Sequence, residues 1–564
     1  MSRSESSGIH RTAITLPYPR AVGSGASFLH RLEAAAQSSL VPTASSASRP
    51  WHAHSRSYFL AAVGFLGIFL FGYDTGLGGG VIALSSFSNS FHITGSADKK
   101  AQLQGNVVAI LQGGAFFGAI IAAWVNDYMG RKRVSVDVGC WIFIVGACIQ
   151  TAATHQISWV YGGRFTSGFG VGLMSAVCPT YASEIAPKEI RGRITGMFQI
   201  VVVTGVAFSY WINYGVTFMD QNRGNIVWRI PIGFQLVPVG FMVVLLPLLK
   251  ESPRWLATKH RDDQALKHLA WIRKLPVSDQ SVQLEYAEIA AAIKEEEEAT
   301  KGASWREVFA KGNPIRFIIA FVIFTLQQWS GQNSISYYAP IIFQSIGIRG
   351  SKSGLLASGI YGIVKIVVTS IFVAFGVERF GRKRPLLVGV ALMSMFLWII
   401  GAIFNTHLPD KNATTTSSAS IAMAVMIYLY VIPYCFSVGP LPWVICSEIF
   451  NNRTRHYGLM TAAATQWLWN FAVTKATPLM VIHMPKGGIF FFFAAINIIS
   501  FCLALFLPDT AGVSLEAMDV IFGSVTKEER EAEIARRAME LEGNGLDDEE
   551  KPGSEHVEHI KSTP

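Results

Sequence analysis

Gly130-Arg131-Lys132-Arg133 recurs later in the chain as Gly381-Arg382-Lys383-Arg384. An acid precedes each copy by a few residues, Asp127 in the first and Glu378 in the second, and long apolar runs flank both. Like charges at matching ends of apolar segments indicate that the duplicated segments cross a membrane in the same orientation.

A second acid and base pair repeats in register with the first. Glu184 and Arg191 follow one apolar run, and Glu448 and Arg455 follow another with the same spacing. Two repeats in the same order predict two related halves.

The composition also indicates a membrane protein. The 564 residues are 51% hydrophobic and only 15% charged, and the mean hydropathy is +0.35. A spanning helix needs roughly 20 apolar residues. We expect twelve such segments near 58–84, 106–126, 134–153, 158–182, 194–218, 228–249, 314–346, 353–376, 385–404, 421–447, 457–482 and 487–507.

The basic residues predict the orientation of these segments. The net charge of +9 does not indicate a nucleic-acid partner, because the basic residues cluster at the ends of apolar runs, in alternate loops. The positive-inside rule places those loops, and both termini, in the cytoplasm. Asn412 begins a glycosylation sequon in a loop that this topology puts outside.

The chain divides into five regions by composition. We expect a disordered N-terminal tail at 1–57, a first membrane region at 58–249, a charged linker at 250–312, a second membrane region at 313–507 and a C-terminal tail at 508–564. The linker is either a pair of short amphipathic helices or a solvated spacer. All six cysteines lie in predicted spans without metal-ligand spacing, so no metal site is expected.

Asp74 in the first span and Arg164 in the fourth are candidates for proton coupling. Ionisable groups inside spans are costly and are functional candidates by default. A buried carboxylate keeps its proton when it is alone and releases it beside an arginine, so a pair that separates is a proton switch. The alternative is a permanent structural ion pair.

Amides and aromatic side chains are concentrated in the seventh span, from Gln327 to Pro340. Amides both donate and accept hydrogen bonds, which suits a polyhydroxylated ligand, and aromatic faces can stack on a sugar ring. Other spans add further candidates. The predicted substrate-binding residues are Gln199, Gln327, Gln328, Asn333, Tyr338, Trp443, Gln466, Trp467, Asn470 and Lys365. For any single residue, interhelical hydrogen bonding is the alternative.

Lys365 in the eighth span has two interpretations. It either snorkels or pairs with a backbone carbonyl, or it is the counter-ion of a carboxylated substrate.

At these residues the chain resembles the sugar porter family of the major facilitator superfamily, over roughly residues 55–522. The resemblance rests on motifs that occur in order. They are Phe71 to Gly76, Asp127 to Arg133, Gly163-Arg164, Glu184 to Arg191, Glu251 to Trp255, Gln327 to Pro340, Glu378 to Arg384, Gly439 to Trp443 and Pro508 to Gly512.

The resemblance implies an all-α membrane protein with the major facilitator fold. Its twelve transmembrane helices would form two six-helix bundles joined by a cytoplasmic helical linker, with alternating access to a central site. Charged residues would form a cytoplasmic gate that locks the outward-facing state. They are Asp127, Arg131, Glu184, Arg191, Glu251, Arg254, Glu378, Arg382, Glu448 and Arg455.

The expected function is proton-coupled import of a monosaccharide across the plasma membrane, because proton-coupled members of the family carry an acid where Asp74 stands. The chain also looks like a fungal branch that includes sugar-acid and quinate carriers, which makes a carboxylated substrate the alternative. A sugar sensor without transport is a rival of another class. We expect a monomer in a lipid bilayer, with the proton as coupling ion, no cofactor and no enzymatic activity.

Overall fold

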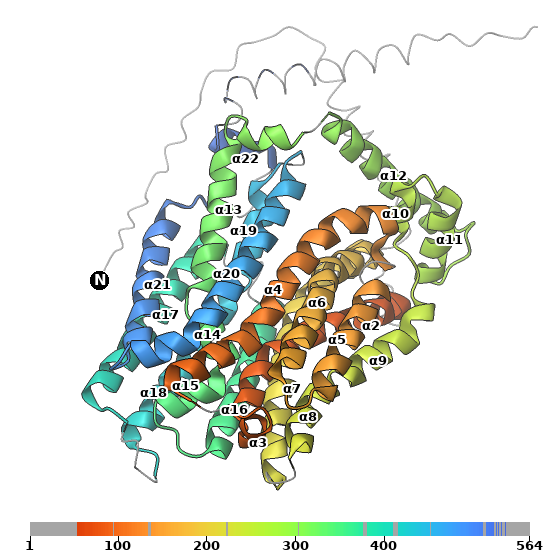
Figure 1. Cartoon of the computed structure of the whole chain (residues 1–564). Coiled ribbons are helices and arrows are strands. Elements are labelled where there is room, and N and C mark those ends of the chain that lie inside the picture. Colours follow the sequence, from red (N-terminus) through yellow and green to blue (C-terminus); the bar gives the residue numbers. More distant parts are fainter. Residues whose placement is uncertain are drawn as a thin grey trace, which may run out of the picture. The chain divides into compact units, whose positions relative to one another are not determined.

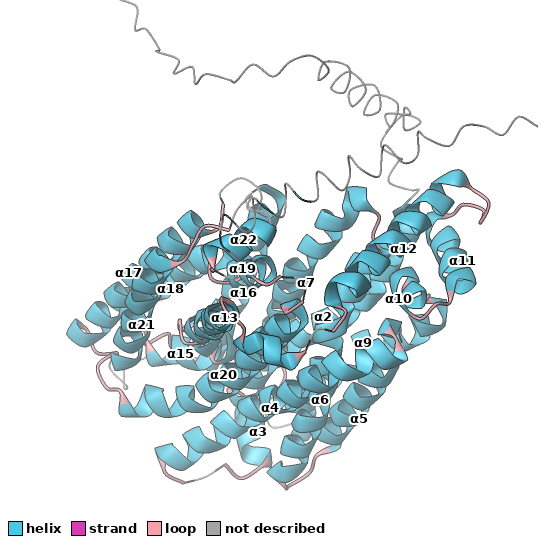
Figure 2. Ribbon diagram, turned by 90° about the horizontal axis from the view of Figure 1, so that it is seen from above, coloured by secondary structure: helices cyan, strands magenta, loops and turns pink. Residues whose placement is uncertain are grey.

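The computed structural model describes residues 54–523 except 94, 133–136, 221–223, 303, 376–380, 410–414, 452 and 511–514, together with isolated positions up to 536. Within these residues the regular elements are helices (Figures 1 and 2).

The first half comprises α2 (Ser55–Ile82), α3 (Ser85–Ser90), α4 (Ala97–Met129), α5 (Gly139–Ala152), α6 (Ile157–Ile185), α7 (Lys188–Gly215), α8 (Asn225–Phe234) and α9 (Leu236–Leu245). The linker holds α10 (Pro253–Thr258), α11 (Asp262–Arg273), α12 (Gln280–Thr300) and the 3-10 helix η6 (Trp305–Phe309). The second half comprises α13 (Asn313–Gln328), α14 (Gln332–Tyr337), α15 (Ala339–Ser345), α16 (Ser351–Phe375), α17 (Lys383–Thr406), α18 (Ser418–Phe436), α19 (Leu441–Ile449), α20 (Arg455–His483), α21 (Gly488–Phe506) and α22 (Leu515–Ile521).

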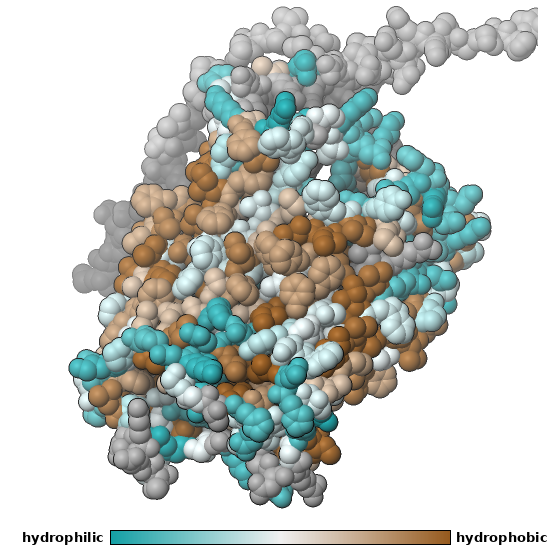
Figure 3. Space-filling model, in the orientation of Figure 1, coloured by the Kyte–Doolittle hydropathy of each residue, from teal (hydrophilic) through white to brown (hydrophobic). Residues whose placement is uncertain are grey.

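Each of the twelve predicted spans coincides with a helix or with consecutive helices. Eight described segments are long and apolar enough to cross a membrane. They are Ser55–Ile82, Ala97–Met129, Lys188–Phe218, Asn225–Leu248, Lys352–Phe375, Lys383–Thr406, Ser418–Ile449 and Gly488–Phe506. The other four are short (α5), interrupted (α13 to α15) or rich in polar residues (α6 and α20). Figure 3 shows hydrophobic residues gathered between hydrophilic ends on one face.

The seventh and tenth spans are broken, and side chains satisfy the backbone groups that the breaks free. Gly331 at the start of α14 has a φ of 99°, a conformation that favours glycine. The carbonyl oxygen of Ser330 accepts hydrogen bonds from Tyr430 and Asn497. In the tenth span, the carbonyl oxygens of Val438 and Gly439 accept from Gln327 (2.7 and 3.1 Å). Breaks at bilayer depth need such partners.

Several helices of the two halves pack against each other. We name the end of the molecule away from the basic tetrapeptides the opposite end, and the end that carries them the basic end. α4 packs against α20, α7 against α16, and α2 against α14 and α15. Gly79 on α2 lies so close to α14 that a Cβ there would stand 1.9 Å from the carbonyl oxygen of Tyr337. Gly79 lies near the opposite end. At that end, Lys475 of α20 also donates a hydrogen bond to Asn106 of α4, and His483 lies 3.2 Å from Asp98.

The linker is helical, as predicted, rather than a spacer. Arg273 at the end of α11 is buried and donates to Ser57 (3.2 Å) and to the carbonyl oxygen of Ile185 (3.0 Å), both in the first half. It also forms a salt bridge of 2.6 Å with Glu285. On the other side, Arg453 of the second half donates to Glu307 in η6 (2.9 Å). The linker therefore contacts both halves.

The segment after the twelfth span contains the short helix α22. Asp519 in α22 pairs with the fully buried Arg316 at 2.6 Å. This ion pair fixes α22 beside the start of α13.

Candidate transport site

A cavity of about 150 Å³ lies between the two halves. It is lined by residues of α2, α4, α6 and α7 from the first half, and by residues of α13, α14, α16, α18, α19 and α20 from the second. The predicted residues that line it are Gln199, Gln327, Gln328, Asn333, Trp443, Gln466, Trp467, Asn470 and Lys365. The structure thus brings together nine of the ten residues proposed for substrate binding.

The second-half wall carries a chain of hydrogen-bonded amides. Gln328 donates to the side-chain oxygen of Gln327 (3.3 Å), and Asn333 donates to the side-chain oxygen of Gln328. Asn333 also donates to Asn470 (3.4 Å), which joins α14 to α20. The side-chain oxygen of Gln466 is buried without a hydrogen-bond partner among the described residues. The wall therefore offers donors and acceptors to a hydroxylated ligand.

Aromatic rings complete the cavity. Trp467 packs edge-on against Phe71 of the first half, with ring centroids 5.3 Å apart. Trp443 packs edge-on against Phe324 at 4.8 Å and is 37% exposed. These contacts fix the planes of the two indoles, and both residues line the cavity.

Tyr338 differs from the prediction. Its hydroxyl donates to the carbonyl oxygen of Thr474 (2.8 Å), and it is absent from the cavity lining. The lining residue is its neighbour Tyr337, whose hydroxyl accepts a hydrogen bond from Asn470 (3.1 Å). The helix break before α14 sets which of the two adjacent tyrosines reaches the cavity, and the sequence alone does not reveal it.

Asp74 and Arg164 are both buried in the first half, 0% and 2% exposed. The Arg164 Nη1 atom lies 3.9 Å from Asp74 Oδ1. In the described part of the chain, neither Asp74 oxygen receives a hydrogen bond, and Arg164 Nε and Nη2 donate none. The pair is therefore in electrostatic contact but loosely held.

Lys365 lines the cavity from α16 and is 7% exposed. Its ammonium group lies 3.3 Å from the Ser336 hydroxyl and 5.7 Å from the centre of the Tyr361 ring. Ser336 also lines the cavity. Neither Ser336 nor Gln112 was predicted from the sequence, because a single serine or glutamine in a span has no distinctive pattern. The side-chain oxygen of Gln112 accepts a hydrogen bond from Asn470 (3.4 Å).

The two basic tetrapeptides form equivalent contacts at the basic end. Arg131 lies 3.1 Å from Glu184 and 3.2 Å from Asp127. Arg382 lies 2.9 Å from Glu448. Among the described residues these ion pairs form within each half, whereas the resemblance implied one charge network.

The remaining predicted gate residues have other partners. Glu251 accepts hydrogen bonds from the backbone of Lys132, and Arg254 pairs with Glu296 of α12 at 2.9 Å. Arg191 donates to the carbonyl oxygen of Ala186 at 3.4 Å. The Nε of Arg455 is buried without a hydrogen-bond partner in the described chain.

Two predicted residues, Glu378 and Asn412, lie outside the described residues.

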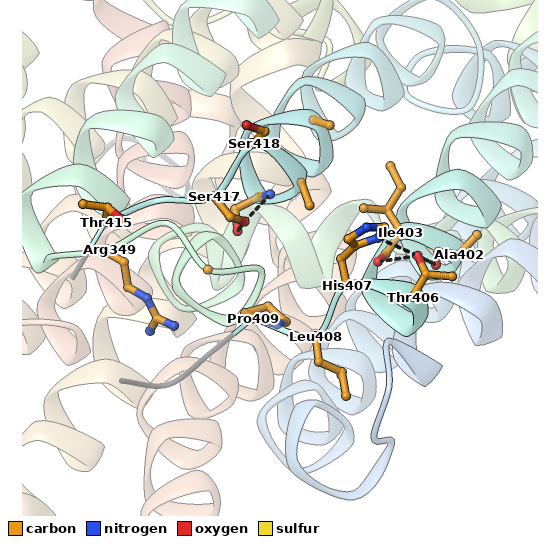
Figure 4. Close-up of a pocket in the computed structure, with 14 residues that line it drawn as sticks. Arg349, Ala402, Ile403, Thr406, His407, Leu408, Pro409, Thr415, Ser417 and Ser418 are labelled. Carbon is orange, nitrogen blue, oxygen red and sulfur yellow. Dashed lines mark hydrogen bonds between the residues drawn. The ribbon is translucent and has the colours of Figure 1, made fainter. Parts of the chain in front are cut away.

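A larger cavity of about 840 Å³ lies at the opposite end (Figure 4). It is lined by the end of α17, His407 to Pro409, Thr415, the start of α18, and Gly347 and Arg349 before α16. Among these described residues, Arg349 and His407 are the charged or titratable groups. None of the predicted substrate-binding residues lines it.

Comparisons with known proteins agree with this architecture. The family described as "Sugar (and other) transporter" matches residues 60–522. A probable quinate permease of Aspergillus clavatus is 37% identical over 83% of this chain and 88% of its own length. The quinate permease of Emericella nidulans is 36% identical over 87% of this chain and 95% of its own.

Solved structures give the same result. The inward-open xylose transporter XylE from E. coli matches with a TM-score of 0.69 and 25% identity, over 82% of this chain and 99% of that one. The proton:xylose symporter XylE bound to 6-bromo-6-deoxy-D-glucose matches with a TM-score of 0.68 and 25% identity, over 83% and 99%. The fold is the major facilitator fold, and the relatives are transport proteins rather than enzymes. The chain belongs to the sugar porter family of the major facilitator superfamily.

Proposed function

We propose that this chain is a proton-coupled symporter that moves a small polyhydroxylated solute by alternating access. The observation that carries the proposal is the buried, loosely held Asp74–Arg164 pair of the first half, beside a cavity whose second-half wall is built of amides. The cation at 3.9 Å favours the charged carboxylate, so a movement that separates the pair would let Asp74, which receives no hydrogen bond from the described residues, take up a proton. The match to a proton:xylose symporter supports this assignment.

In the proposed cycle, a proton from outside neutralises Asp74 and frees Arg164 from its electrostatic partner. The solute then binds to the amides between the halves, and closure over it opens the other side. One proton crossing about 100 mV gains roughly 2.3 kcal/mol, and one pH unit adds roughly 1.4 kcal/mol. For a neutral solute, perfect coupling would sustain an accumulation on the order of several hundredfold.

We propose that the basic end faces the cytoplasm and that the protein lies in the plasma membrane, with both termini inside. Four basic loops at one end of the apolar segments support this orientation. With it, the close contacts of Gly79 with Tyr337 and of Lys475 with Asn106 lie on the outer side. The conformation described is then closed to the outside. We further propose that the protein works as a monomer, with the proton as its coupling ion and no other cofactor.

The substrate has two candidates. The amides and the two tryptophans of the cavity suit a monosaccharide. The second candidate is a hydroxylated carboxylic acid of the quinate or sugar-acid type, which the names of the fungal relatives favour. A sensor without transport lacks support of this kind, because the relatives are named permeases.

Uptake by the full chain in a transporter-deficient host tests the function. Radiolabelled glucose, xylose, galacturonate and quinate are offered at pH 5 and pH 7, with and without a proton uncoupler. We expect one of them to accumulate above its outside concentration at pH 5 and to fall to the outside concentration with the uncoupler. Binding of a solute without uptake of any would support the sensor, and uptake that ignores the uncoupler would overturn proton coupling.

A further inference from the structure

The position of Lys365 within α16 excludes snorkelling, which is one part of the first interpretation of this residue. Lys365 lies fourteen residues after the start of α16 and ten before its end, which places it roughly 21 Å and 15 Å from the two ends of the helix at the usual rise of about 1.5 Å per residue. A lysine side chain extends only about 6 Å, so its ammonium group cannot reach either end by snorkelling.

The hydrogen-bond partner of the ammonium group excludes pairing with a backbone carbonyl, which is the other part of that interpretation. The hydrogen bond that Lys365 donates goes to the Ser336 hydroxyl, not to a backbone carbonyl. The Tyr361 ring faces the ammonium at 5.7 Å, and Cys435 of α18 is the other titratable neighbour. Among the salt bridges of the described residues, none includes Lys365, and Asp74 is engaged by Arg164. The described neighbours of this cation are therefore a hydroxyl, an aromatic ring and a thiol, and none of them is a carboxylate.

Neighbouring residues hold this arrangement in place. Gln332 donates to the Tyr361 hydroxyl (2.6 Å) and to the Ser336 hydroxyl (3.0 Å). Tyr210 of the first half donates to the carbonyl oxygen of Ser336. Ser336 is therefore held by residues of both halves. Lys365, which contacts Ser336, lines the cavity between the two halves.

A buried cation without an anion is costly in a membrane, and such residues pair or mark a substrate pathway. The cavity beside Lys365 holds amides for hydroxyl groups but, among the described residues, its lining contains no acid. An arriving carboxylate would supply the missing charge, whereas a neutral sugar would leave the cation unpaired. The site is thus electrostatically complementary to an anion.

We propose that Lys365 binds the carboxylate of the transported solute and that the substrate is a hydroxylated monocarboxylate, ionised at neutral pH. This inference rests on the proposed proton symport. It has a consequence for the driving force: one proton carried with one monoanion moves no net charge. Transport is then electroneutral, the membrane potential contributes nothing, and accumulation is limited to about tenfold per pH unit. A neutral sugar with one proton would instead be electrogenic.

The test uses the purified full chain in liposomes with an inward pH gradient, and radiolabelled quinate as the probe. Galacturonate and galactose serve as a matched pair of competitors, because they differ in having a carboxylate or a hydroxymethyl group at one carbon. We expect quinate to accumulate, galacturonate to compete at least tenfold better than galactose, and a potential imposed with potassium and valinomycin to leave the accumulation unchanged.

Two variants of Lys365 test whether this residue causes the preference for galacturonate over galactose. Lys365→Met should raise the KM for quinate at least tenfold and remove the preference for galacturonate, while Lys365→Arg, which keeps the charge, should retain the preference. Lys352→Met is the matched control, because Lys352 lies on the same helix, is exposed and lies outside the cavity lining; it should behave as the wild type. The wild-type competition and Lys365→Arg keep the test decisive if Lys365→Met does not fold.

The inference is overturned if galactose competes as well as galacturonate, if the potential drives quinate uptake, or if folded Lys365→Met keeps the wild-type preference. Proton-driven accumulation of a neutral sugar but not of quinate would also overturn it while leaving the symport proposal intact. If no solute accumulates under the pH gradient, the proposed symport itself fails.

Discussion

The two walls of the cavity differ in chemistry. The first-half wall is mainly apolar, with Phe71, Phe198, Val202 and Val203 in the lining, and it has Asp74 and Arg164 buried in the helices of the same half. The second-half wall carries Lys365 and five of the six amides that line the cavity; the sixth, Gln199, belongs to the first half. This division suggests that one half handles the proton while the other holds the solute.

A division of this kind requires a connection between the walls. Tyr337 provides the contact, because its hydroxyl accepts from Asn470 of the second half and has Thr75 and Gln112 of the first half beside it. Arg164 is also among its electrostatic neighbours. The Asp74–Arg164 pair and the second-half wall therefore meet at the Tyr337 phenol.

The largest expected effect comes from removing an amide of the second-half wall. Gln328→Ala removes the hydrogen bonds that join Gln328 to Gln327 and to Asn333. We expect the KM for the transported solute to rise roughly tenfold to a hundredfold, measured as initial uptake. Val203→Ala on the apolar wall is the control and should leave the KM within about threefold. Equal effects at the two positions would remove the distinction between the walls.

Next in size is a steric block where the walls converge at the opposite end. In Gly79→Ala the new methyl group meets the carbonyl oxygen of Tyr337 at 1.9 Å, so α2 and α14 must separate. We expect the balance of conformers to shift roughly fivefold to a hundredfold away from the state closed at this end, with slower solute exchange.

Gly215→Ala is the matched control, because a Cβ there meets nothing within 4 Å. Labelling of a cysteine placed at the opposite end reports the conformer ratio. Unchanged labelling in Gly79→Ala would show that the contact does not close this end.

A smaller effect is expected at the connection itself. Tyr337→Phe deletes one hydroxyl, and one hydrogen bond contributes about 0.5–1.5 kcal/mol. We expect the accumulation ratio to fall roughly twofold to tenfold while exchange continues. Tyr338→Phe also loses one hydrogen bond, but to Thr474 and outside the lining, and should keep full coupling. If both variants still couple solute accumulation to the proton gradient normally, Tyr337 does not connect the two walls.

The smallest effect lies outside both walls. Arg453 donates hydrogen bonds to Glu307 and holds the pKa of that carboxyl below its usual value. The stabilisation is therefore complete above the usual glutamate pKa of about 4.3 and is lost only as the pH falls through the lower folded value.

We expect Glu307→Gln to lower the thermal stability slightly and equally at pH 5 and pH 8, because exposed pairs contribute about 0–1 kcal/mol. Coupling and KM should not change. Glu296→Gln, which removes the exposed ion pair with Arg254, is the comparison variant and should lower the stability by a similarly small amount. A loss that is present at pH 8 and absent at pH 5 would contradict the pKa direction.

The sequence predicted the fold because membrane spans and charged helix ends are local patterns. Apolar length identified all twelve segments, and the repeated Gly-Arg-Lys-Arg identified the two halves. The residues of the amide wall could be predicted for the same reason, since polar groups such as Gln327 and Asn470 are conspicuous inside apolar helices.

Other features depend on contacts between distant helices and could not be predicted. The choice of Tyr337 over Tyr338 follows from the helix break near Gly331. The pairings of Arg131 with Glu184 and of Arg382 with Glu448 join residues that are 53 and 66 positions apart in the sequence. The surroundings of Lys365 come from α14, α16 and α18 together, so its neighbours could not be predicted from the sequence.

We propose above that Asp74 couples proton movement to solute movement. The most direct measurement compares wild type and Asp74→Asn in liposomes, with accumulation under a pH gradient and exchange at equal pH recorded on the same preparation. We expect the variant to exchange solute but to reach only equal concentrations on the two sides. Accumulation by Asp74→Asn at the wild-type ratio would contradict it.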